Sequence, residues 1–172
     1  KIKEHKRLDS LIAYCDSATC RRQTLLSYFK ETCEPCGKCD NCLNPPQMID
    51  GTEYAQMVLS AIYRTGQYFG SGHIVDVLRG VASDKVKVKG HDKIKTFGVG
   101  RTATADFWKT FIRQMVSANY LLINIKRYGA LQITKKGETV LKGEEEYFYR
   151  KIEFNTPIKE KRIKAETIDA DT

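Results

Sequence analysis

Two short helices are predicted near the start of the chain, over residues 2–14 and from about residue 19 to residue 30. The apolar positions that share a face are Leu8, Leu11, Ile12 and Cys15 in the first helix and Leu25, Tyr28 and Phe29 in the second. Asp16-Ser17 separates the two. A helical hairpin of this size buries too little apolar surface to fold alone, so it needs a staple.

Three further helical patterns follow residue 51. The first ends at Thr65-Gly66, the second follows Gly70-Ser71-Gly72, and the third runs from about residue 104 to residue 119. Their predicted core positions are Tyr54, Met57, Val58, Ala61 and Ile62, then Ile74, Val77, Leu78 and Val81, then Trp108, Phe111, Ile112 and Met115. Residues 67–69 are predicted to be extended. Residues 82–101 lack a clear period, which predicts a long basic loop with one helical turn around residues 92–96.

Two alternating runs come next and predict a β-hairpin. The residues that face one way are Leu121, Ile123 and Ile125 on the first strand and Leu131 and Ile133 on the second. Tyr128-Gly129 is predicted to form the tight turn, because glycine tolerates a positive φ. Residues 134–137 are predicted to be a break before a short helix around residues 138–141.

The order helix, helix, basic loop, helix, hairpin is typical of a winged helix, in which the third helix usually reads DNA and the hairpin forms the wing. The predicted fold class is therefore mainly α with a small β-hairpin (α+β). Pro45-Pro46 indicates a stiff joint, which places a helical module at residues 1–46 and the winged-helix domain at residues 47–150. Residues 151–172 are predicted to be a linker or disordered tail, because they are highly charged and poor in aromatics.

The charge balance indicates an anionic partner. The 172-residue chain carries 29 Lys and Arg against 21 Asp and Glu, a net charge of +8 and a pI of about 9.2. Nucleic acid is the first candidate for such a basic protein, and a basic surface without a partner is the alternative. No apolar run approaches the roughly 20 residues of a membrane span, and no apolar segment follows the basic residues 1–7 as in a signal peptide.

Six cysteines without a secretory signal favour metal ligands over disulfides. Four of them fall in the run Cys33-Glu34-Pro35-Cys36-Gly37-Lys38-Cys39-Asp40-Asn41-Cys42. A tetrahedral zinc site takes four ligands, and a set of Cys20, Cys36, Cys39 and Cys42 would pin the helical hairpin to this loop. The alternatives are the set Cys33, Cys36, Cys39 and Cys42, an iron–sulfur cluster, or no metal. The first module is thus predicted to be a helical-hairpin zinc-binding module, with Cys15 as a small buried apolar residue.

With these motifs the chain resembles the RecQ family of DNA helicases over about residues 1–150. The resemblance rests on Thr19-Cys20-Arg21-Arg22, residues 25–29 and 34–42 in the zinc-binding part, and on residues 69–72, 90–93 and 112–114 in the winged helix. It implies that the zinc ligands are Cys20, Cys36, Cys39 and Cys42, and it leaves Cys15 and Cys33 outside the site. The short wing resembles the bacterial branch.

The resemblance further implies binding of double-stranded or forked DNA, within an enzyme that unwinds duplexes 3′ to 5′ with ATP in DNA recombination and repair. The sequence has no GxxxxGK[ST] phosphate loop, so ATP and Mg²⁺ are expected only in motor domains before Lys1, and this fragment alone is expected to be inactive. Further expectations are a cytoplasmic, nucleoid-associated bacterial protein and a contact of the winged helix with a single-stranded-DNA-binding protein.

Phosphate contacts are predicted in residues 85–113, which hold eight Lys and Arg against two Asp. The predicted DNA-binding residues are Lys93, Lys95, Arg101, Lys109, Arg113, Lys126, Arg127 and Tyr128. Lys109 and Arg113 repel each other at i, i+4, so an anionic group is expected against that helix face. Tyr128 is predicted either to stack on a terminal base pair and help split the strands or to fold back onto the wing.

Other functions fit part of the same pattern. A winged-helix transcriptional regulator with a structural zinc would select one operator over random DNA by about 10³-fold or more, and a protein-interaction module would not bind DNA even at low salt. The glycines of Gly70-Ser71-Gly72 either offer backbone amides to a phosphate or form a simple turn. His73 and His91 are predicted to be hydrogen-bonded structural or surface residues, and no catalytic residue is predicted.

Overall fold

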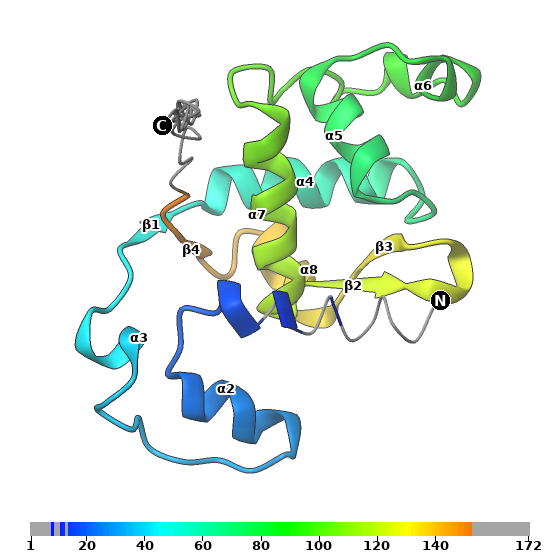
Figure 1. The fold of residues 1–172 in the computed structure, drawn as a ribbon. Coiled ribbons are helices and arrows are strands. Elements are labelled where there is room, and N and C mark those ends of the chain that lie inside the picture. Colours follow the sequence, from blue (N-terminus) through cyan, green and yellow to red (C-terminus); the bar gives the residue numbers. More distant parts are fainter. Residues whose placement is uncertain (1–7, 9–10, 13, 153–172) are drawn as a thin grey trace, which may run out of the picture.

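Three helices form the core of the winged-helix part (Figure 1). The computed structural model describes residues 8, 11–12 and 14–152. The three helices are α4 (Thr52–Arg64), α5 (Ser71–Arg79) and α7 (Ala105–Ser117). Their inward stripes meet around Ile62, Leu78 and Trp108, which are all fully buried, and the indole Nε1 of Trp108 donates to the Gly100 carbonyl at 3.0 Å. The predicted fold class, mainly α with a small β component, is confirmed, as is the core position of Trp108.

The wing, residues 121–133, is an antiparallel hairpin of β2 (Leu121–Asn124) and β3 (Ala130–Ile133). Leu121 pairs with Ile133, and the side chains of Leu121 and Leu131 are buried in the core. Ile125 was expected in the first strand but belongs to the 3₁₀ turn η2 (Ile125–Arg127). The segment predicted to be extended at residues 67–69 is not a strand, but the Phe69 carbonyl accepts a hydrogen bond from the Leu131 N–H at 2.9 Å.

The stretch predicted as a long basic loop contains two short helices, α6 (Asp84–Val88) and η1 (His91–Lys93). The prediction missed α6 because Val86 is its only buried residue, so five residues give no apolar period. Val81 was expected in the core and is instead 41% exposed. The reason is Gly80, which ends α5 in a left-handed conformation with φ +72°, so that the chain turns away before Val81.

The last helix, α8 (Lys135–Leu141), begins where the sequence predicted a break. The Thr134 hydroxyl caps it by accepting a hydrogen bond from the Gly137 N–H at 3.1 Å. Gly137 is buried in the first turn of α8, and a Cβ added there would overlap the Tyr120 carbonyl oxygen. The glycine therefore permits a close approach of two backbone segments and does not interrupt the helix.

Gly137→Ala is expected to lower the free energy of unfolding by about 1–3 kcal/mol, because the new methyl group meets backbone that cannot move aside. A denaturant titration followed by the fluorescence of Trp108, the single tryptophan, measures this. Gly72→Ala is the matched control: it also lies in the first turn of a helix, and an added Cβ there meets nothing within 4 Å. Equal losses in the two variants would contradict the packing account.

A second small sheet, which the sequence did not predict, joins the two ends of the winged-helix part. In it β1 (Met48–Asp50) pairs antiparallel with β4 (Phe148–Arg150), and Ile49 lies opposite Tyr149. The rings of Tyr147 and Tyr149 are buried and meet Phe111 edge-on. The boundaries at residues 46 and 150 stay predictions, and the tail predicted for residues 151–172 lies, beyond Ile152, outside the described residues.

The N-terminal part consists of helical residues that end at Asp16, then α2 (Arg21–Tyr28) and α3 (Asp40–Leu43). The helix predicted for residues 2–14 lies partly outside the described residues. The second predicted helix is confirmed but shorter at both ends, and its Leu25 and Phe29 are 53% and 64% exposed. Among the described residues, no helix has both the length and the apolar character that a bilayer crossing needs.

Candidate metal centre and nucleic-acid interface

Four cysteine sulfurs converge between α2 and α3. The Sγ atoms of Cys20, Cys36, Cys39 and Cys42 all lie within 4.8 Å of one another, and those of Cys20 and Cys39 are 3.9 Å apart. Zinc–sulfur bonds of about 2.3 Å in a tetrahedron put neighbouring sulfurs about 3.8 Å apart. The donor set and its spacing therefore fit one zinc ion.

Backbone turns bring these sulfurs together. Cys20 directly precedes α2 and Cys39 directly precedes α3. The Cys36 N–H donates to the Cys20 sulfur at 3.3 Å, and the Arg21 N–H donates to the Cys39 sulfur at 3.4 Å. Gly37 has a φ of +66°, a conformation that glycine adopts without strain, and this lets the chain turn between two of the cysteines.

The same contacts favour thiolates at two of the four positions. The Cys36 N–H lowers the pKa of Cys20 to about 6, and the Arg21 N–H lowers the pKa of Cys39. The hydrogen bond with the Cys39 sulfur, followed by burial, raises the pKa of Cys42 to about 11. The four thiols thus do not all ionise by themselves at neutral pH, and a bound cation is what allows the full set to lose its protons.

Cys15 and Cys33 lie outside this cluster. The Cys33 carbonyl accepts a hydrogen bond from the Gln23 amide at 2.8 Å, so Cys33 ties the loop to α2 through its backbone. Cys15 was predicted to be buried and is exposed. That prediction is wrong because the end of the first helix turns this side chain toward solvent.

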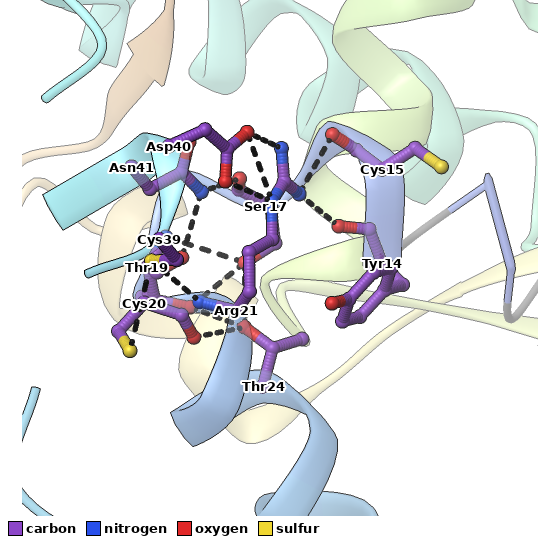
Figure 2. A network of polar contacts seen from close by, with 10 residues as sticks. All are labelled: Tyr14, Cys15, Ser17, Thr19, Cys20, Arg21, Thr24, Cys39, Asp40 and Asn41. Carbon is purple, nitrogen blue, oxygen red and sulfur yellow. Dashed lines mark hydrogen bonds and ion pairs between the residues drawn. The ribbon is translucent and has the colours of Figure 1, made fainter. Parts of the chain in front are cut away.

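Arg21 joins three segments around the cysteines, as Figure 2 shows. Its guanidinium forks onto Asp40, with Nε 3.0 Å from Oδ1 and Nη2 2.8 Å from Oδ2, and its Nη1 donates to the carbonyls of Tyr14 and Cys15. This hydrogen bonding lowers the pKa of the Asp40 carboxyl to about 2. Sequence reasoning missed the pair. The signal was available, because the two charged residues directly follow Cys20 and Cys39, which one ion would bring together.

Asn41, the residue after Asp40, makes a second set of hydrogen bonds in the same region (Figure 2). Its buried side-chain amide donates to the carbonyls of Ser17 at 2.9 Å and Thr19 at 2.8 Å. Both carbonyls belong to the turn that precedes Cys20. The turn, α2 and α3 are therefore held by hydrogen bonds as well as by the cysteine cluster.

Carboxylates of the protein lie beside two of the cations that the sequence predicted to bind DNA on α7. Arg113 Nε is 2.7 Å from an oxygen of Asp16, at the end of the first helix, and Lys109 Nζ is 3.6 Å from Asp106. The close neighbours of these two cations are thus carboxylates of the same chain. The Arg101 side chain packs against Gly80 and Gly98, since a Cβ added at either position would overlap its guanidinium, and it has no ion-pair partner among the described residues.

Several exposed lysines without an ion-pair partner among the described residues lie away from α7. They include Lys85 and Lys87 on α6, Lys89 directly after it, Lys93, Lys95 and, on the wing, Lys126. In Figure 1, α6 and the wing project to the same side of α7. Phe69 shares a hollow with α6, and a Cβ added at Gly70 would lie 3.4 Å from the Gly129 carbonyl oxygen of the wing. We call this surface, made of α6, residues 66–72 and the wing tip at residues 125–129, the basic face.

His73 and His91 lie beneath the basic face. Their Nε2 and Nδ1 atoms are 2.8 Å apart, and the Phe69 ring stacks on His73 at a centroid distance of 4.1 Å. Burial lowers the pKa of both imidazoles, so both are neutral at pH 7. The hydrogen bond agrees with the prediction that they are hydrogen-bonded structural or surface residues.

Tyr128 stands at the wing tip with its side chain fully exposed. Its φ is +54° and that of Gly129 is +81°, so both residues of the predicted turn adopt the left-handed conformation. The alternative in which Tyr128 folds back onto the wing is not observed. Arg127 does fold back: its guanidinium carbon lies 4.9 Å from the centroid of the Tyr68 ring.

Two family matches together cover most of the chain. Residues 1–43 match the RecQ zinc-binding family and residues 45–157 match the RQC domain family. The ATP-dependent DNA helicase RecQ of Haemophilus influenzae is 39% identical over 84% of this chain and 24% of the relative. The enzymes of the same name from Pasteurella multocida and Bacillus subtilis are 37% and 33% identical over 83% and 81% of this chain. The chain spans about a quarter of the length of these curated relatives.

Proposed function

Because this chain belongs to the RecQ helicase family, with a RecQ zinc-binding region followed by an RQC domain, we propose that it is the platform on which a 3′→5′ ATP-dependent DNA helicase of recombination and repair binds duplex or forked DNA. The observation that carries the proposal is the fully exposed Tyr128 at the tip of a wing on a basic face. ATP and Mg²⁺ are assigned to other parts of such an enzyme, since this sequence has no phosphate loop.

The zinc-binding part of the proposal assigns one structural Zn²⁺ to Cys20, Cys36, Cys39 and Cys42. The convergence of their sulfurs supports this set over the one that contains Cys33. Zinc supplies a crosslink between residues far apart in the sequence, and its binding free energy contributes directly to folding. The residues of the chain position the ligands: two backbone N–H groups donate to the sulfurs, and Arg21 and Asn41 hold the surrounding turns.

The DNA-binding part of the proposal places the phosphate backbone along the basic face. Lys126 of this face supplies a cation, as do the exposed Lys93 and Lys95, which follow α6 in the chain, and the start of α5 at Ser71 offers backbone N–H groups. Lys109 and Arg113 are proposed contacts of less weight, since each already lies beside a carboxylate of the protein, and Arg101, which packs against two glycines, is a further proposed contact. Contacts of this kind position a duplex without reading its sequence, which suits a helicase.

A fluorescence titration of the chain with forked duplex at several salt concentrations tests this function, with zinc measured on the same sample. Equal affinity for forks of unrelated sequence and a steep loss of affinity with salt are expected. Preference for one sequence by about 10³-fold or more would instead support a transcriptional regulator. Absence of DNA binding at low salt would support a protein-interaction module.

Lys126→Ala is expected to reduce the slope of log K against log salt concentration by about one, because one phosphate contact is lost. Lys109→Ala is the matched control: it removes another exposed lysine, whose ammonium group already lies beside Asp106. The control is expected to change the slope by clearly less. A larger change of the slope for Lys109→Ala would mean that the DNA contacts α7 and not the basic face.

Two further parts of the proposal rest on the resemblance to bacterial RecQ proteins. We assign the protein to the cytoplasm at the nucleoid, and we assign the winged helix a contact with a single-stranded-DNA-binding protein. Isothermal titration of the chain with such a protein tests the contact. The absence of a heat change at micromolar concentrations would contradict the contact with this partner and would not affect the DNA-binding proposal.

A further inference from the structure

The loop between α4 and α5 is fixed against the wing on both sides of Tyr68. The Gln67 side-chain oxygen accepts a hydrogen bond from the Ile133 N–H at 2.9 Å, and the Phe69 carbonyl accepts one from the Leu131 N–H, also at 2.9 Å. Both donors belong to β3. The backbone that carries Tyr68 therefore keeps a fixed place relative to the wing, although the side chain is 62% exposed.

The wing tip rests on this loop through Arg127. The Arg127 guanidinium lies over the face of the Tyr68 ring at 4.9 Å, within the range of an attractive cation–π contact. Asn124 supports the same turn, since its side-chain oxygen accepts the Arg127 N–H at 3.2 Å and its carbonyl accepts the Gly129 N–H at 3.0 Å. The two residues next to Tyr128 in the chain are thus both held.

Tyr128 itself has no such support. Its side chain is fully exposed, and its φ of +54° is one that residues other than glycine rarely adopt. A free hairpin of this length would sample other turn conformations and would point the ring in other directions. The contacts of its neighbours are what bias the turn toward the observed form.

We infer that Tyr68 is a positioning residue, which holds Arg127 and thereby fixes the direction in which Tyr128 projects toward DNA. In this assignment Arg127 acts chiefly as the support of the wing tip, although it is also one of the cations predicted to bind phosphate. The structural part of the inference, that Tyr68 holds Arg127 and the wing tip, does not depend on DNA binding. Only its consequence for strand separation rests on the proposed function.

Amide hydrogen exchange of the DNA-free chain tests the structural part. Tyr68→Ala is expected to speed exchange of the Arg127 and Gly129 N–H groups by about 2- to 5-fold, the population change that an exposed cation–π contact supports. Tyr68→Phe keeps the ring and is expected to exchange as the unchanged chain does. Identical exchange in Tyr68→Ala and the unchanged chain would overturn the inference, whatever the DNA experiments give.

A double-mutant cycle on forked DNA tests the consequence, with 2-aminopurine in the terminal base pair as the reporter of its opening. Tyr68→Ala is expected to reduce the opening by about 2- to 5-fold when Tyr128 is present, and to have no further effect in a Tyr128→Ala background. The same loss in both backgrounds would mean that Tyr68 touches DNA directly, which overturns the positioning role. If Tyr128→Ala alone has no effect on opening, the proposed strand-separating function fails, while the exchange result still decides the role of Tyr68.

Discussion

Cys20→Ser is expected to abolish zinc binding and to unfold the zinc-binding region up to about residue 44, while the winged helix stays folded. Structural zinc contributes about 10–16 kcal/mol in small zinc modules, which is comparable with the whole stability of a domain. The zinc-binding region has little apolar core to keep it folded, since Leu25 and Phe29 are mostly exposed. The loss of one ligand therefore removes most of what stabilises it.

The fluorescence of Trp108 distinguishes unfolding of the zinc-binding region from unfolding of the winged helix. Trp108 is the single tryptophan and is fully buried in the winged-helix core, so its fluorescence melting curve reports that domain alone. In Cys20→Ser this curve is expected to stay within about 1 kcal/mol of the unchanged chain, because the ion pair between Asp16 and Arg113 is exposed on the arginine side and worth little. Metal analysis and limited proteolysis around Arg21 are expected to show loss of zinc and rapid cleavage.

Cys33→Ser is the matched control for this substitution. It makes the same chemical change a few residues from the cluster, at a cysteine whose sulfur is not one of the four that converge. Zinc content, proteolysis and melting are all expected to stay as in the unchanged chain. Zinc retained by Cys20→Ser, together with zinc lost from Cys33→Ser, would replace the proposed ligand set with the one confined to the loop.

The helices of the core were predictable because their stabilising residues are local and periodic. Ile62 on α4, Leu78 on α5 and Trp108 on α7 each belong to a stripe that repeats every three or four residues, and all three are buried as expected. The cysteine cluster was partly predictable for a different reason. The spacing of the loop cysteines indicated a metal site, and the need to tie the helical hairpin to the loop favoured Cys20 over Cys33, as did the resemblance to RecQ proteins.

The features that could not be predicted depend on contacts between residues far apart in the sequence. Ile49 and Tyr149 pair across a sheet of three-residue strands, which are too short to show alternation. Gly137 was taken for a break because its role becomes visible only when the Tyr120 backbone is seen beside it. The partner of Arg113 is Asp16, in another part of the chain, so the sequence could show the repulsive i, i+4 pattern on α7 but not the carboxylate that lies beside it.

The two readings of Tyr128 also needed the structure. The sequence placed an aromatic residue at the hairpin tip between cations and a glycine, which fits both a ring on the wing and a ring in solvent. In the structure the two adjacent side chains differ: Arg127 packs on the Tyr68 ring, and Tyr128 is fully exposed. An exposed ring held on a fixed turn is suited to stacking on a base pair, because little conformational entropy is lost on contact.

Tyr128→Ala is expected to reduce the rate at which the proposed full-length helicase unwinds forked duplex by about 5- to 150-fold. This range corresponds to the roughly 1–3 kcal/mol by which a stacked base stabilises a protein–DNA contact. Tyr128→Phe keeps the stacking surface and is expected to unwind at a rate close to that of the unchanged enzyme. The affinity for fully paired duplex is expected to change little in both variants, because phosphate contacts supply it.

The contrast between forked and fully paired DNA identifies the step that Tyr128 serves. A ring that only adds to binding would lower the affinity for both substrates alike and would leave the unwinding rate at saturating DNA unchanged. A ring that stabilises the opened pair lowers that rate while duplex affinity is kept. Wild-type unwinding by Tyr128→Ala at saturating forked DNA would therefore remove the wing from strand separation, and the basic face would remain only a platform that holds the duplex.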